Sequence, residues 1–139
     1  MSTLRKLNYL QLLRLELWLE SYGVVLSHRM RHEYSDVLPV ARLFNEVHPG
    51  RADLHGYTPS SSVPLKANNW RIFNERVLAK MNMALTTNEQ HQLAIGAVGR
   101  LEALLHKLML SDLTPRLEGG AQSYKNNTIP QKIIMGEYS

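Results

Sequence analysis

The hydrophobic and polar positions between residues 86 and 110 form the clearest pattern in the chain. Thr86-Thr87-Asn88-Glu89 has the spacing of a capping box, and no proline follows before residue 110. Small and apolar residues then alternate at spacings of three and four, as in the seam of a helix that packs lengthwise on another: Ala94, Ala97, Leu101, Leu104 and Leu108. The pattern predicts one unbroken helix of about two dozen residues over 86–110.

Three earlier segments also have helical periodicity. The first, near 3–21, has a leucine-rich face broad enough for burial on more than one side, and Gly23 is placed to end it. The second runs through 36–47 with Pro39 in its first turn, where proline is tolerated. The third runs through 69–85. These patterns predict an all-α fold of four main helices, with a long C-terminal helix and an irregular C-terminal arm.

Turn-forming residues divide the chain between and after these helices. Glycine, proline and three consecutive serines between residues 49 and 68 indicate a long loop. After residue 110 the chain is broken repeatedly by glycine, asparagine and proline, and only Ile129 to Met135 has the composition of a short strand or clasp. We therefore predict a single helical domain over 1–110 with a loop at 49–68, followed by an irregular arm over 111–139.

Composition limits the class of protein. The chain has 139 residues, the size of one domain, and no cysteine, which excludes disulfides, zinc–thiolate sites and thiol catalysis. No apolar run approaches the roughly eighteen residues needed to span a bilayer. Charged residues interrupt the N-terminal leucines and no small-residue cleavage site follows, so we expect no signal peptide. These features predict a cytoplasmic protein without membrane contact.

No combination of residues specifies a catalytic or metal site. His28 and His32 lie four apart, but the His-Glu-x-x-His motif is absent, and the arginines at 29 and 31 would repel a cation. The serine run at 60–62 lacks a Gly-x-Ser-x-Gly elbow, and neither a Walker pattern nor Gly-x-Gly-x-x-Gly occurs. We therefore predict that the protein is not an enzyme and uses no cofactor or metal.

A mild basic excess suggests a binding function. Sixteen Lys and Arg against twelve Asp and Glu give a net charge of +4. Five cations between Gly23 and Asn68 are the candidate contacts to phosphates or to an acidic protein surface: Arg29, Arg31, Arg42, Arg51 and Lys66. The first two would diverge by about 200° on a helix but share one side of an extended turn. Because Gly23 and Ser27 precede them and a new helix cap follows, we predict the extended turn.

Two features suggest nucleic acid as the partner. A tight turn at Leu85-Thr86 joins two predicted helices, which is compatible with a helix-turn-helix or with an antiparallel hairpin in the core. In addition, Leu15-Glu16-Leu17-Trp18 runs into Ser21-Tyr22-Gly23, and a Gly56-Tyr57-x-Pro59-Ser60 loop precedes a helical second half. In this layout, over roughly residues 12–60, the chain resembles small phage-encoded late-gene antiterminators and related regulators. The resemblance implies a DNA-binding protein that regulates transcription.

We therefore expect a small intracellular regulatory protein, phage-encoded, that binds nucleic acid or the transcription machinery without a catalytic step. The alternative is a protein-binding adaptor or inhibitor whose groove, lined by Trp18, Trp70 and the long helix, holds a partner helix. The seam of the long helix also allows two interpretations. It forms either a homodimer interface, which we predict, or the core of a monomer.

Overall fold

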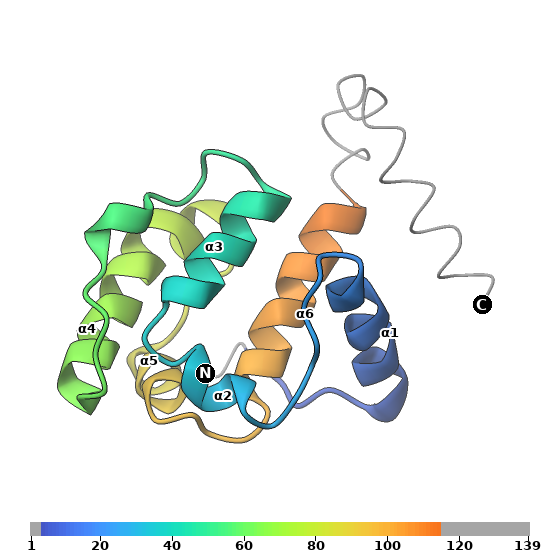
Figure 1. Ribbon diagram of the computed structural model, residues 1–139, viewed down its shortest axis with the longest axis horizontal. Helices are drawn as coiled ribbons and strands as arrows, with labels where there is room; N and C mark the ends of the chain where they lie inside the picture. Colours follow the sequence, from blue (N-terminus) through green and yellow to red (C-terminus); the bar gives the residue numbers. More distant parts are fainter. Residues whose placement is uncertain (1–3, 115–139) are drawn as a thin grey trace.

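The computed structural model describes residues 4–114, and every regular element among them is helical (Figure 1). The α-helices are α1 (Tyr9–Glu20), α2 (Met30–Glu33), α3 (Leu38–Val47), α4 (Val63–Phe73), α5 (Thr87–Ala94) and α6 (Arg100–Leu113). Three short helical turns supplement them: η1 (Leu54–Gly56), η2 (Asn74–Leu78) and η3 (Ala79–Met81). The all-α prediction is confirmed, although the described residues form six α-helices where four main helices were predicted. The predicted arm over 111–139 begins too early, because α6 continues through Leu113, and from 115 onward the arm lies outside the described residues.

Helix α1 begins later than the leucine pattern predicted because Asn8 caps it. The Gln11 backbone N–H donates to Asn8 Oδ1 at 2.8 Å, and the Asn8 N–H donates to Gln11 Oε1 at 2.9 Å. These reciprocal bonds form a capping box. The preceding residues are not helical, but Leu4 is buried, and its N–H donates to the Glu89 carboxylate at 2.7 Å. The N-terminal segment is thereby attached to the start of α5.

The predicted helix over 86–110 is two helices, so the prediction of an unbroken helix is wrong. Its capping box is present, since the Glu89 N–H donates to Thr86 Oγ1 and the Thr86 N–H donates to the Glu89 carboxylate. Helix α5 nevertheless ends at Ala94, because Gly96 and Gly99 adopt φ of +73° and +84°. Glycine enters this left-handed region without the steric penalty of a Cβ atom. The glycines therefore form a turn that redirects α6.

The seam predicted as a homodimer interface lies inside one chain. Four of its residues are buried in the core, namely Ala94, Leu101, Leu104 and Leu108, and Ala97 is half-buried in the turn between α5 and α6. Helix α6, which carries the three leucines of the seam, packs against both α1 and α5. This is the second interpretation of the seam. It removes the observation on which the homodimer was predicted, so dimerisation no longer has support from this pattern.

The third predicted helix starts earlier than expected and changes its winding. Helix α4 begins at Val63 with a proline in its first turn, so the end of the predicted loop at 49–68 is helical. After Phe73 the chain continues through η2 and η3 and stops at Asn82, whose φ is +61°. Phe73 packs edge to face on Phe44 of α3, with ring centroids 5.2 Å apart. Trp70 donates its indole N–H to the Ser35 carbonyl at 2.9 Å.

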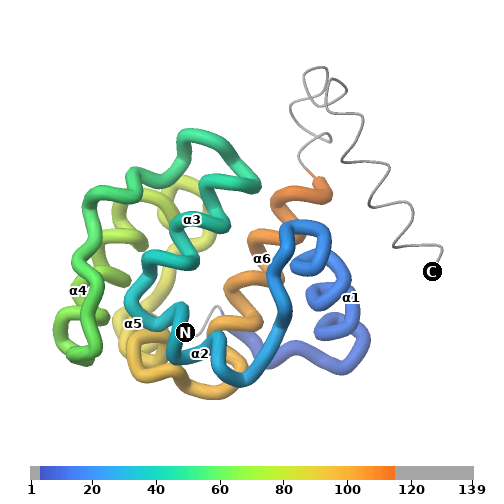
Figure 2. The backbone as a smooth tube through the Cα atoms, viewed as in Figure 1, coloured from blue at the N-terminus to red at the C-terminus, as the bar shows by residue number. Residues whose placement is uncertain are grey.

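Figure 2 shows how the chain path arranges these helices. Helices α1 and α6 lie side by side at one end of the molecule, and α4 packs on α5 at the other. The segment over 21–29 leaves the C-terminal end of α1, crosses α6 and leads into α2. Tyr22, Val24 and Leu26 of this segment are partly buried against the core. Helix α1 therefore lies at the edge of the fold with one face turned to solvent.

Candidate protein-binding surfaces

The basic segment around Arg29 is helical, so the predicted extended turn is wrong. Arg29 precedes the single turn of α2 with helical backbone angles, and Arg31 lies within that turn. Arg29 is exposed, whereas Arg31 is directed toward Glu102 of α6. The two guanidinium groups therefore do not project to one side as a pair. Tertiary structure decided this, because the partner of Arg31 lies 71 residues away in the sequence.

Arg31 and Glu102 form an almost buried ion pair. Arg31 Nη2 and Nε lie 2.9 and 3.1 Å from Glu102 Oε2, and the side chains are 17% and 9% exposed. The other carboxylate oxygen, Oε1, is buried and has no hydrogen-bond partner within the described residues. Glu102 thus depends on Arg31 for its charge compensation. Arg31, one of the five predicted contact residues, is committed to the fold.

Helix α2 also contacts the turn between α5 and α6. A Cβ atom built on Gly96 would lie 3.1 Å from Cε1 and Nδ1 of the His32 ring and 3.3 Å from the Arg31 carbonyl oxygen. The two glycines of the turn differ in this respect, since a Cβ on Gly99 would meet only Lys6 Cγ at 4.0 Å. The ion pair and this close packing together fix α2 on the end of α6.

Asp112 joins the C-terminal ends of α1 and α6. The Trp18 indole N–H and the Tyr22 hydroxyl donate to Asp112 Oδ2 at 2.8 and 3.0 Å. The pKa of Tyr22 is raised, first by burial and then by the Asp112 carboxylate. Trp18 and Trp70 are both buried, so they do not line the partner-binding groove predicted from the sequence.

His48 and Ser111 lie beside this junction, but they do not form a nucleophilic triad. His48 Nε2 is 2.9 Å from Ser111 Oγ, and the Ser111 hydroxyl donates to the Leu108 carbonyl at 2.6 Å. The hydroxyl proton is therefore bound within α6. Burial lowers the pKa of His48, and the nearby Asp112 opposes that shift.

A second histidine contact lies at the surface. His55 Nδ1 lies 3.3 Å from Asp53 Oδ1, and both side chains are largely exposed. Hydrogen bonds from the His55 backbone and ring lower the pKa of Asp53. Among residues 4–114, no group of three or more His, Asp or Glu side chains is positioned to hold a metal ion. Within the same residues, no helix has the length and apolarity required to cross a membrane.

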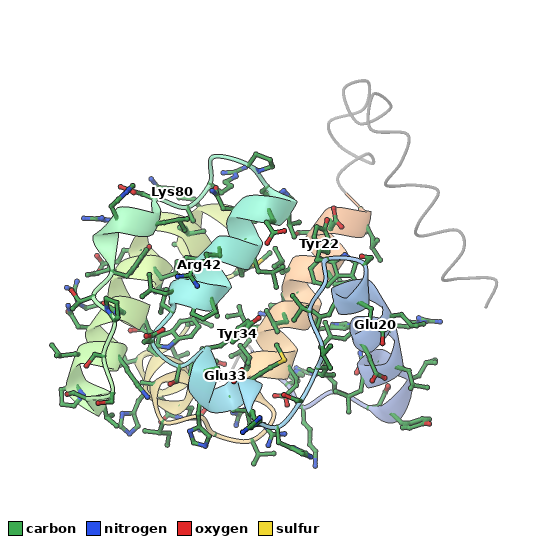
Figure 3. All side chains as sticks on the ribbon, in the orientation of Figure 1. Glu20, Tyr22, Glu33, Tyr34, Arg42 and Lys80 are labelled. Atoms are coloured by element: carbon green, nitrogen blue, oxygen red, sulfur yellow. The ribbon has the colours of Figure 1, made fainter. Side chains whose placement is uncertain are left out.

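The remaining predicted contact residues come from four successive parts of the fold. Arg29, Arg42 and Arg51 are exposed, Lys66 is half-buried, and none of the four forms an ion pair within the described residues. Figure 3 shows Arg42 on α3 above Tyr34 and Glu33. Burial raises the pKa of Tyr34, Glu33 and Glu46 add to that shift, and Arg42 opposes it. The cations are therefore available to a partner, but acidic residues lie among them.

An exposed apolar surface on α1 was missed by the sequence prediction. Tyr9, Leu10, Leu13 and Leu17, here called the α1 strip, are 77, 53, 37 and 49% exposed. The leucine pattern indicated burial on more than one side, but only Leu15, Trp18 and Leu19 of α1 are buried. The spacing of the three exposed leucines, at 10, 13 and 17, was the available signal. This spacing indicates a second apolar face on the helix, but it does not indicate whether another part of the protein covers that face.

Comparisons with known proteins give this architecture a context. Sperm flagellar protein 1 of Mus musculus is 25% identical over 134 residues, which cover 86% of this chain and 57% of the relative. The Bos taurus and Homo sapiens proteins of the same name are 30% and 29% identical over 106 residues, or 76% of this chain and 43% of each relative. The chain thus spans about half the length of these relatives.

These relatives overturn the resemblance to phage antiterminators. They are animal proteins named for the sperm flagellum, so the predictions of a phage-encoded regulator of transcription and of DNA binding are wrong. The basic excess and the helical layout that supported those predictions are equally compatible with a protein-binding domain. The family model described as a CH-like domain in sperm protein matches residues 15–110, from the middle of α1 almost to the end of α6. On this match, the chain belongs to the family of CH-like domains in sperm protein.

Proposed function

We propose that this chain is a non-catalytic protein-binding module that docks on the cytoskeleton of a flagellum or cilium. The proposal rests on one observation: the chain belongs to the family of CH-like domains in sperm protein, and its relatives are named sperm flagellar protein 1. This assignment corresponds to the protein-binding alternative from the sequence, with a different surface in place of the groove.

The exposed cations suggest the chemistry of the partner. Arg29, Arg42 and Arg51 carry long side chains without an acidic partner in the described part of the chain, and Lys66 adds a fourth charge. Such groups favour an acidic protein surface, which they attract over a Debye length of about 10 Å at 0.1 M salt. Microtubules, the polymers that run along a flagellum, present an acidic surface. They are the partner we propose.

Sedimentation of the full chain with polymerised tubulin tests this proposal. We expect the chain to pellet with microtubules at low salt and the bound fraction to fall as salt rises, because exposed charges are screened. Replacing two of the cations, Arg42→Glu with Arg51→Glu, should lower affinity roughly tenfold or more, since two attractive charges become repulsive.

A charge-matched variant controls for the change in net charge. Arg5→Glu with Arg14→Glu reverses two exposed charges before and on α1, which lies across α6 from α3 (Figure 1). This control should keep its affinity within about threefold of the unmodified chain. No sedimentation of the unmodified chain, or equal loss in both variants, would contradict the proposed surface.

A further inference from the structure

The α1 strip is an apolar helix face without a partner among the described residues. Its three leucines follow one another along a single face, and Tyr9 extends that face at its N-terminal end. Covering such side chains is favourable by about 25 cal/mol per Å² of apolar surface removed from water. Contiguous exposed apolar patches of this kind mark binding sites more often than isolated exposed leucines do.

The chain leaves the described part of the fold beside this strip. Helix α6 ends at Leu113, and Asp112 is hydrogen-bonded to Trp18 and Tyr22 at the C-terminal end of α1. The described part of the chain therefore ends, at Thr114, near the end of α1 closest to Leu17. Helix α1 has 12 residues and is about 18 Å long. The fourteen residues from 115 to 128 reach up to about 45 Å when extended, which is ample to bring Ile129 anywhere along α1.

The sequence that follows this spacer is apolar and carries the complementary charge. Residues 129–135, here called the clasp segment, read Ile-Pro-Gln-Lys-Ile-Ile-Met. Residues 119–136 contain Lys125 and Lys132 but no Asp or Glu. Glu16 and Glu20 lie on α1 along one edge of the strip, and Glu20 is exposed (Figure 3). In the sequence, a basic, apolar segment therefore follows a spacer long enough to reach an apolar strip with an acidic edge.

We propose that the clasp segment folds back on the α1 strip of the same chain. Its isoleucines cover Leu10, Leu13 and Leu17, and its lysine lies toward the acidic edge of α1. A short tether gives such an intramolecular contact an effective concentration in the millimolar range. A second copy is the less suitable occupant, because stable interfaces use about 20–30 residues a side and the strip supplies four. The proposal is independent of the microtubule proposal.

Cysteine pairing in the full chain tests the contact. The chain has no cysteine of its own, so Leu13→Cys with Ile133→Cys introduces the only two thiols. We expect an intramolecular disulfide to form at least roughly tenfold faster than in a control pair. The control, Glu75→Cys with Ile133→Cys, places the first thiol at an exposed position beyond α4, since the Glu75 side chain is 62% exposed. Mass spectrometry under dilute oxidising conditions separates monomers from disulfide-linked dimers.

A second measurement avoids any bias from the thiols. In the full chain, Ile133→Ser with Ile134→Ser should shift the methyl NMR signals of Leu10, Leu13 and Leu17, and leave those of buried Leu104 unchanged. Equal disulfide rates in the two pairs, or unchanged strip signals, would overturn the proposal. Disulfides formed only between chains would also overturn it and would identify a second copy as the occupant.

Discussion

At the level of single residues, the ion pair between Arg31 and Glu102 shows most clearly which charged side chains stabilise the fold and which are available for binding. The sequence grouped Arg31 with Arg29 as a contact residue, but Arg31 compensates a nearly buried carboxylate whose second oxygen has no partner in the described part of the chain. Arg29, two positions away, is free for a partner. Neighbouring arginines thus differ in role because only one of them has an acidic side chain within reach.

Arg31→Ala should destabilise the fold by about 2–4 kcal/mol, because it leaves the Glu102 charge buried and uncompensated. Arg29→Ala should change stability by less than about 0.5 kcal/mol, as expected for an exposed side chain. Urea denaturation of both variants measures the difference. Equal stability of the two variants would refute the role assigned to the ion pair.

His48 should make the fold less stable in acid. Because burial lowers its folded-state pKa below the usual 6.5, the unfolded chain binds the proton first as pH falls. The contribution of His48 is therefore fully present above about pH 6.5 and is lost as pH falls below that value. His106, whose pKa is also lowered by burial, acts in the same direction.

Urea denaturation between pH 5 and 8 can isolate the part due to His48. In His48→Gln the dependence of stability on pH should be shallower over this range than in the unmodified chain. An identical pH profile for His48→Gln and the unmodified chain would show that His48 is not the titrating group.

At the level of elements, the turn between α5 and α6 determines how the two halves of the predicted long helix are used. Without it, the seam from Ala94 to Leu108 would be one straight surface suited to lengthwise pairing. With it, α5 packs on α4 while α6 packs on α1, so the same residues fill one core. The capping box at Thr86 fixed the start of α5, but two glycines fixed its end.

Gly96→Ala should destabilise the protein by about 2 kcal/mol or more. Alanine at a φ of +73° costs about 1–2 kcal/mol, and its Cβ would also press on the His32 ring and the Arg31 carbonyl. Gly99 has a similar φ but an open environment, so Gly99→Ala should lose only the stability that corresponds to the backbone strain. Thermal unfolding of the two variants compares them, and an equal loss would show that the contact with α2 is unimportant.

At the level of the whole molecule, function depends on which surfaces the core leaves uncovered. Helix α1 is held by α6 on one face and leaves the α1 strip on the other. The cations of the proposed microtubule contact, Arg29, Arg42, Arg51 and Lys66, lie on or beside α2, α3 and α4, so this contact and the α1 strip are placed on different elements. This separation allows the proposed clasp and the proposed microtubule contact to be tested by different substitutions.

The sequence by itself determined the features that depend on near neighbours. The helical class, the capping box at Thr86 and the proline in the first turn of α3 follow from periods and bonds within a few residues, and all are present in the structure. The capping box between Asn8 and Gln11 is equally local and was available as the start of α1. The mild basic excess was not specific, since it suits nucleic acid and acidic protein alike.

Only the tertiary structure decided which faces are covered and which charges are compensated. Arg31 meets Glu102 across 71 residues, Leu4 meets Glu89 across 85, and Trp18 meets Asp112 across 94. No local pattern encodes such pairs, because each depends on the direction in which whole helices leave their turns. The same holds for α1, whose leucines look alike in sequence. Packing against α6 buries one face of that helix and leaves the other in water.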